Sequence, residues 1–174
     1  MPSNLEHIKK VSGTDVTSLT TPQVFSADYD VYFVNAQWER VTTYPEVYLT
    51  DSSNNVLNHS TNDDEYDSAL LVMKSNDSYA DNQQANTYVG WRELGAYVDN
   101  VDEGYGMSMY VYNPFDSSSY TFVTAQSASM VSNVLWGGKA IGAFTKDQQC
   151  NGLHFGNSSG SACDYIIANI YGVK

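Results

Sequence analysis

The sequence predicts an all-β protein, a sandwich or barrel, on the basis of three observations. Aromatic residues, which favour strands, are frequent: the 174 residues include 14 Tyr, 6 Phe and 3 Trp. Stretches of alternating apolar and polar residues recur roughly every 10 to 15 residues, with polar turn-forming segments between them. No long segment keeps the 3.6-residue periodicity of an amphipathic helix. Short, regularly spaced strands of this kind are typical of sandwiches and barrels.

The length of the chain fits a single domain with one full hydrophobic core, and no linker-like change of composition divides it. We predict an N-terminal extended segment, residues 1–22, followed by one β-sandwich domain, residues 23–174. Apolar side chains in the N-terminal segment are irregularly spaced. This spacing is compatible with two short strands or with one strand and a turn.

The first half of the domain contains one clear strand and several weaker ones. The stretch YDVYFVNAQWERV (29–41) carries apolar residues on both faces, which is typical of a strand inside a sandwich. The weaker predictions, in chain order, are a strand EVYLT (46–50) after Pro45, a turn at 51–55, a polar acidic loop at 58–67, a strand or single helical turn at 68–75, a long polar connection at 76–86 and a strand at 87–94.

The stretch YVYNPFDSSSYTF (110–122) predicts a β-hairpin. Met107, Met109 and Val111 alternate with polar residues and Tyr, which gives the strand before it one apolar face. Asn113-Pro114 ends that strand, because proline has no N–H to donate to a neighbouring strand. The serine-rich turn that follows leads into a second strand at 120–124.

The C-terminal third predicts three more strands. Gly137-Gly138 indicates a turn, and strands are expected at 139–145, 150–156 and 164–174. In the last of these, Ile166, Ile167, Ala168 and Ile170 are apolar on both faces, so we expect it at the centre of the sandwich.

The charge of the chain excludes some partners. Its 20 acidic and 8 basic residues give a formal net charge of −12. Nucleic-acid binding needs a basic surface that neutralises phosphates, and binding to an anionic membrane also needs basic residues. We therefore expect neither nucleic acid nor membrane as a partner. The N-terminus lacks the pattern of a signal peptide and no window is apolar enough for a membrane span, so the chain is expected to be made in a cytoplasm.

We find no pattern that predicts catalysis, and therefore expect no catalytic, cofactor-binding or metal-binding residues and no cofactor. His7, His59 and His154 are scattered and match no metal motif. The acidic runs at 63–67 and 99–103 leave calcium binding open, although solvated loops are the favoured interpretation. Glycoside hydrolysis uses a pair of carboxylates. A chain with 20 acidic residues contains many such pairs, so their presence does not indicate this activity.

The cysteines and tryptophans have two interpretations each. Cys150 and Cys163 are interpreted as two reduced, small apolar residues rather than as a disulfide, because a cytoplasm is reducing. Trp38, Trp91 and Trp136 are interpreted as core or interface residues, with a sugar-stacking surface as the alternative.

Four stretches of the chain are distinctive in combination: MPSNLE at the start, YDVYFV near residue 30, the hairpin MYVYNPFDSSSYTFVTAQSA and the C-terminal NGLHFGNSSGSACDYIIANIYGVK. Together they resemble a family of small virion proteins of tailed bacteriophages, especially marine ones, with a jelly-roll-like antiparallel β-sandwich fold. The shared positions are Tyr29-Asp30, Asn113-Pro114 with Tyr120, and the ending 171–174, Tyr-Gly-Val-Lys. His154 departs from the arginine or aromatic residue usual at its position. The resemblance implies a jelly-roll β-sandwich of the carbohydrate-binding-module kind and brings no catalytic residues.

From this resemblance we expect a non-enzymatic structural protein on the virion surface, a capsid decoration or knob protein. Its expected partners are other copies of itself, as a homotrimer, and other virion proteins such as the major capsid protein. Residues 1–22 are expected to contact the shell or a neighbouring subunit, with Lys9 and Lys10 directed to an acidic surface. The alternative is a tail-fibre or receptor-binding tip protein that recognises host surface glycans through unknown ligand-binding residues.

Overall fold

The computed structural model describes residues 4–40, 43–57, 65–76, 78–88, 90–92, 94 and 104–174. Within these residues the chain is an all-β antiparallel sandwich, which confirms the predicted fold class. The strands are β1 (Leu5–Val16), β2 (Leu19–Thr21), β3 (Val31–Glu39), β4 (Pro45–Thr50), β5 (Tyr66–Lys74), β6 (Ser78–Tyr88), β7 (Trp91–Arg92), β8 (Tyr105–Tyr112), β9 (Thr121–Val131), β10 (Val134–Phe144), β11 (Gly152–Asn157) and β12 (Cys163–Val173). Among the described residues, no helix has the length and hydropathy needed to cross a bilayer.

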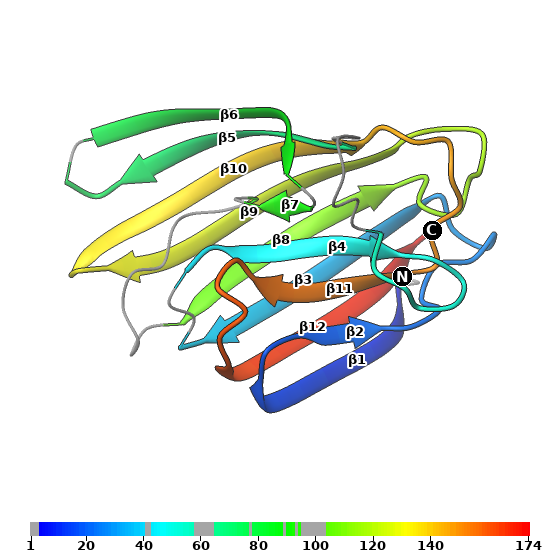
Figure 1. The fold of residues 1–174 in the computed structure, drawn as a ribbon, viewed down its shortest axis with the longest axis horizontal. Coiled ribbons are helices and arrows are strands. Elements are labelled where there is room, and N and C mark those ends of the chain that lie inside the picture. The colour runs from blue at the N-terminus through cyan, green and yellow to red at the C-terminus, as the bar shows by residue number, and fades with distance from the viewer. Residues whose placement is uncertain are drawn as a thin grey trace.

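Two sheets of unequal size form the sandwich. The larger has eight strands in the order β1-β12-β3-β8-β9-β10-β5-β6, and the smaller has four in the order β2-β11-β4-β7. Figure 1 shows the smaller sheet in front of the middle of the larger one. The larger sheet therefore has an inner face, toward the smaller sheet, and an outer face on the opposite side.

The N-terminal residues belong to both sheets. β1 pairs with β12 at the edge of the larger sheet, and β2 pairs with β11 at the edge of the smaller one. Both strands of the predicted N-terminal segment, residues 1–22, are therefore hydrogen-bonded to strands of the sandwich. The C-terminal β12 lies between β1 and β3, so it is paired on both sides as expected for a central strand.

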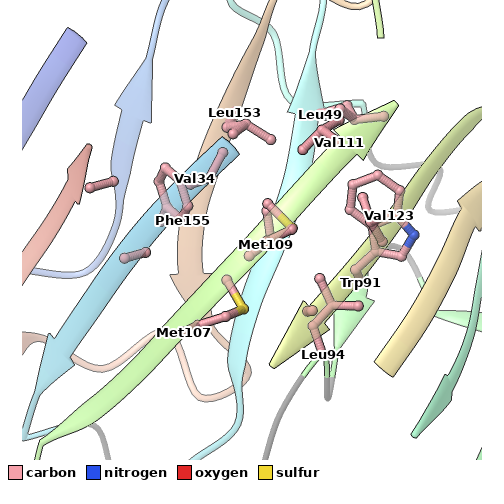
Figure 2. Close-up of a cluster of buried hydrophobic side chains, with 14 of the residues drawn as sticks. Val34, Leu49, Trp91, Leu94, Met107, Met109, Val111, Val123, Leu153 and Phe155 are labelled. Carbon is pink, nitrogen blue, oxygen red and sulfur yellow. The ribbon is translucent and has the colours of Figure 1, made fainter. Parts of the chain in front are cut away.

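The core lies between the inner face and the smaller sheet, as the close-up in Figure 2 shows. Met109 and Val111 from β8 and Leu153 and Phe155 from β11 are fully buried there. The buried Trp91 Nε1–H donates to the Ala143 carbonyl at 3.2 Å. This pairing avoids the cost of burying a polar atom without a partner.

The predicted hairpin forms as expected, and one turn was placed wrongly. β8 and β9 pair antiparallel across the 113–120 connection. Gly137-Gly138 does not form a turn, because β10 runs through both residues. The chain reverses instead at Ser132 and Asn133, whose φ angles of 50° and 65° match the two-residue turn that joins twisted strands.

A second correction concerns residues 76–86, which we predicted to be a polar connection. Most of this stretch belongs to β6, which pairs with β5 at the far edge of the larger sheet. An edge strand has no requirement for apolar residues on both faces, so its sequence lacks the pattern on which the prediction depended. Of the strand expected at 87–94, residues 87–88 belong to the end of β6 and residues 91–92 form β7. The stretch expected at 68–75 to be a strand or a helical turn lies in strand β5 up to Lys74.

The residues that carry the family resemblance meet at one end of the larger sheet. The Asn113 N–H donates to the Asp30 carbonyl at 2.8 Å, and Asn113 has the positive φ of 55° that its turn requires. The Tyr29 ring covers Gly172 so closely that a Cβ there would lie 2.5 Å from it. Lys174 forms an ion pair with Glu6 and its backbone N–H donates to the Asn4 carbonyl. These motifs therefore have a structural role in closing this end of the sheet.

Candidate ligand-binding face

The outer face of the larger sheet is the broadest surface that the described strands leave uncovered. Strands alternate their side chains between two faces, so every second residue of β3, β8, β9 and β10 points away from the smaller sheet. Most exposed large apolar side chains of the described residues lie on this face. Cross-strand register then decides which outward residues become neighbours, and it divides the face into three parts.

The first part is an aromatic ladder, formed by His7, Tyr171, Phe33 and Tyr110. These residues come from β1, β12, β3 and β8 and lie opposite one another in consecutive strand pairs. The ring centroids are 5.3 Å apart for His7 and Tyr171, 6.0 Å for Tyr171 and Phe33, and 5.1 Å for Phe33 and Tyr110. Tyr110, at the end of the ladder, is 41% exposed.

The second part is an open hollow beside the ladder, which we call the amide hollow. It has a volume of about 610 Å³, within the range of small-molecule sites. Gly106 and Ala128 lie opposite each other on β8 and β9 and form its floor. A Cβ at Gly106 would meet no atom within 4 Å, so the space above this part of the floor is open. Its polar lining comes from Asn35, Gln37, Ser108 and Gln126.

These four polar side chains have unused hydrogen-bonding capacity. Within the part of the chain that the structure describes, none of their side-chain atoms forms a hydrogen bond to protein. A smaller pocket of about 200 Å³ adjoins the hollow and shares Ser108 and Gln126 with it; we call it the extension, and Tyr110 of β8, Thr124 of β9 and Lys139 of β10 also line it. No Asp or Glu is among the described residues that line the hollow or its extension.

The third part is an apolar patch, formed by Phe122, Ile141 and Leu71. Their exposed fractions are 46%, 62% and 41%. They lie on β9, β10 and β5, at diagonal positions of adjacent strands, so their side chains are neighbours. Exposed apolar side chains gathered on one surface are typical of a protein contact.

The tryptophans do not form a sugar-stacking surface. Trp38 and Trp91 are fully buried in the core, as the favoured interpretation predicted. Trp38 contacts Tyr105 and Phe155 edge-to-face, with centroid distances of 5.4 and 5.7 Å. Trp136 is partly buried, and the Lys74 ammonium lies 3.9 Å from its ring centroid.

The other residues considered for chemistry are held in separate places. Six of these residues lie outside the described part of the chain: His59, Asp63, Asp64, Asp99, Asp102 and Glu103. Glu65 is buried and forms an ion pair with Lys146, which compensates its charge. Among the described residues, no group of three or more His, Cys, Asp or Glu could hold a metal ion. Cys150 and Cys163 are both buried as free thiols, and burial raises the pKa of the Cys150 thiol to about 12.

His154 lies on the outer surface of the smaller sheet, where its Nδ1 hydrogen-bonds with the Thr20 hydroxyl at 2.8 Å. The Tyr48 ring contacts it edge-to-face, with the centroids 5.7 Å apart. Burial lowers the pKa of the His154 imidazole below its ordinary value. The side chain is therefore a packed, neutral histidine near pH 7.

No sequence signal identified the amide hollow. Asn35, Ser108 and Gln126 are far apart in the sequence and match no motif. The available signal was the alternation of apolar and polar residues within each strand, which indicates that these three polar residues point away from the core. Only the register between strands brings them together.

Comparisons with known proteins do not place the chain in a family. No protein-family model and no curated protein matches it. Among solved structures, an exo-inulinase from Aspergillus awamori is similar with 8% identity and a TM-score of 0.37, over 98% of this chain and 29% of that one. A sucrose-6-phosphate hydrolase from Lactobacillus gasseri is similar with 9% identity and a TM-score of 0.36, over 97% of this chain and 28% of that one. A double mutant of congerin II has 9% identity and a TM-score of 0.21, over 95% of this chain and 93% of that one.

The chain spans less than a third of the length of either hydrolase. At these TM-scores, the neighbours establish neither a family nor an activity for it. What the structure itself establishes is the class: an antiparallel β-sandwich with an uncovered, chemically divided outer face.

Proposed function

We propose that this chain is a non-enzymatic structural protein of a tailed-bacteriophage virion, a decoration or knob protein on the capsid surface. In this proposal it is made in the host cytoplasm and acts as a small homo-oligomer, a trimer, that contacts other virion proteins such as the major capsid protein. The observation that carries the assembly is the apolar patch of Phe122, Ile141 and Leu71. A patch of this kind is costly to leave in water and is stabilised when a partner covers it.

The sequence resemblance supplies the virion part of the proposal. Its motifs close one end of the larger sheet, which agrees with a scaffold role rather than a catalytic one. β1 is an edge strand of that sheet, and an unpaired edge can hydrogen-bond to another chain. The predicted contact of the N-terminal segment with the shell or a neighbouring subunit uses this edge.

The chemistry of the outer face supports a function without catalysis. Glycoside hydrolysis requires two carboxyl groups that flank the scissile bond. The described residues around the amide hollow supply neutral amides and hydroxyls, with Lys139 as the charged group of its extension. Such a lining can hold a ligand but does not supply an acid and a base at that place.

Two measurements test this function. Light scattering on the purified protein should give a trimer, and quantitative mass spectrometry of particles should give a copy number in the range of capsid proteins. The substitution Ile141→Glu should convert the oligomer to a monomer with an unchanged far-ultraviolet circular dichroism spectrum, because Ile141 makes little contribution to the core. Ser117→Glu, in the exposed turn after β8, adds the same charge away from the patch and should keep the trimer.

A strictly monomeric wild-type protein that is present at only a few copies per particle would contradict the decoration role. The second candidate function, a tail-fibre or receptor-binding tip that recognises host glycans, would then be preferred. The amide hollow favours that second candidate.

A further inference from the structure

We propose that the amide hollow and its extension bind a neutral, extended glycan that runs across β3, β8, β9 and β10. This inference rests on the second candidate function and names its site and ligand class. The hollow itself lies toward the opposite end of β8 from Tyr112, which faces Phe122 of the apolar patch. It rests on the shape of the hollow, on its hydrogen-bonding groups, on the aromatic ring at its side and on its charge.

The shape fits a chain rather than a single small molecule. The hollow is lined by residues of β3, β8 and β9, and its extension reaches Lys139 on β10. Four adjacent strands span roughly 14 Å from the first to the last, which is about the length of three linked pyranose rings. The hollow is open to solvent, so a glycan longer than three rings can bind with its ends extending beyond it.

The lining supplies hydrogen bonds of the type that sugars need. A sugar hydroxyl both donates and accepts, and an amide side chain offers one carbonyl acceptor and two N–H donors on adjacent atoms. Asn35, Gln37 and Gln126 provide three such groups, and the Ser108 hydroxyl provides a fourth. These side chains have no hydrogen-bond partner among the described residues, so ligand binding would break no existing protein contact.

Tyr110 gives the hollow an apolar wall. Its ring lines the extension beside Ser108 and Gln126, and Phe33 supports it from the neighbouring strand at 5.1 Å. The C–H groups of a pyranose form an apolar surface that packs against a flat aromatic ring. Aromatic side chains with a few well-placed polar groups are the usual composition of ligand sites.

The charge selects neutral sugars. The chain has a formal net charge of −12, which repels anionic polymers over long range. No carboxylate is among the described residues that line the hollow or its extension. A neutral ligand that binds there would therefore not bury an unpaired carboxylate. Lys139 then acts as a hydrogen-bond donor to hydroxyl or ring oxygens. Binding of a neutral glycan should change little when salt is added.

The experiment uses the intact chain and four trisaccharide-sized probes. Cellotriose, maltotriose and mannotriose are the neutral probes, and trigalacturonic acid is the anionic one. Each is titrated to millimolar concentration while amide shifts of the ¹⁵N-labelled protein are followed. We expect at least one neutral probe to shift resonances of β3, β8 and β9, with little effect of added salt and weaker binding of the anionic probe.

Matched variants locate the site. Gly106→Trp places a large side chain at the floor of the hollow, where an added Cβ would meet no atom within 4 Å, and should abolish binding. Ser117→Trp adds the same side chain in the exposed turn after β8, outside the hollow, and should keep binding. Gln126→Ala removes one hydrogen-bonding group and should weaken binding roughly two- to tenfold. Far-ultraviolet circular dichroism and thermal unfolding of each variant check that it is folded.

Three results would overturn the proposal: no shift with any neutral probe, shifts that Gly106→Trp leaves unchanged, or tighter binding of the anionic probe. If Gly106→Trp changes the oligomeric state while no sugar binds, the hollow is an interface for a second copy of the chain. Gly106→Trp separates the two proposals, because Gly106 is distant along β8 from Tyr112, the residue opposite Phe122, so the variant should abolish sugar binding and keep the trimer. Loss of either property without the other therefore identifies which proposal has failed.

Discussion

The two faces of β8 show how one strand can carry two unrelated sets of requirements. The inward residues Tyr105, Met107, Met109 and Val111 have exposed fractions of 1%, 3%, 0% and 0%. The outward residues alternate with them and are Gly106, Ser108, Tyr110 and Tyr112. Close packing against the smaller sheet determines which residues fit inward. Folding places little demand on the outward ones, so their identities reflect what the outer face contacts.

Glycines give the same contrast. At Gly142, on the inner face, an added Cβ would lie 2.9 Å from both Trp91 Nε1 and Val123 Cγ2. At Gly106, on the outer face, an added Cβ would meet nothing within 4 Å. Gly142 is therefore required by the core, whereas Gly106 leaves a space that the fold does not need. This difference separates residues that hold the sandwich together from residues that shape a site.

The largest expected effect comes from truncating an inward residue of β8. Met109→Ala should lower the free energy of unfolding by about 2–5 kcal/mol, because it removes a buried side chain and leaves a cavity. Urea unfolding at one fixed protein concentration measures this loss. Ser108→Ala, the outward neighbour on the same strand, is the control and should change stability by less than about 0.5 kcal/mol.

Equal losses for these two variants would show that the outward face is also covered in the folded protein. That result would break the contrast between the faces. It would also contradict the view that Ser108 is available to a ligand.

A smaller effect is expected from the glycine pair. Gly142→Ala should cost about 1–3 kcal/mol, because its Cβ cannot fit without moving the Trp91 and Val123 side chains. Gly106→Ala should be neutral or stabilising by up to about 1 kcal/mol, since alanine loses less backbone freedom on folding. Thermal unfolding of both variants beside the wild type gives the comparison. A destabilised Gly106→Ala protein would mean that the floor of the hollow is already filled.

The smallest expected effect concerns pH and the outer surface of the smaller sheet. Because burial lowers the pKa of His154 in the folded state, the unfolded chain binds this proton more readily. The contribution to stability is therefore complete above the unfolded pKa and is lost as the pH falls through the unfolded and then the folded pKa. Urea unfolding between about pH 7.5 and pH 5 should show this decline, and His154→Gln should reduce it.

An NMR titration of the ring gives an independent measurement. The His154 midpoint should lie below that of an ordinary exposed histidine. A midpoint at or above the ordinary value would show that the ring is hydrated, and that this surface is as open as the outer face of the larger sheet.

The elements that were predicted well are those with strong local signals. The alternation of apolar residues at Met107, Met109 and Val111 predicted strand β8. Asn113-Pro114 predicted the end of that strand and the hairpin to β9. The failures lie where local signals mislead. Gly137-Gly138 is typical of a turn, but the positive φ angles lie at Ser132 and Asn133, and the two glycines are residues of strand β10. The stretch 76–86 is polar, yet it forms edge strand β6 because pairing with β5 satisfies its backbone.

The sequence by itself determined the β-sandwich class, the burial of Trp38 and Trp91, and the net charge that disfavours anionic partners. These follow from composition and from period-two patterns, which act over a few neighbouring residues. The tertiary structure alone decided that Phe33 and Tyr110 would form one end of an aromatic ladder and that Asn35, Ser108 and Gln126 would surround one hollow. The physical reason is that cross-strand register depends on hydrogen bonding between segments far apart in the chain, and a shift of one residue would turn each of these side chains to the opposite face.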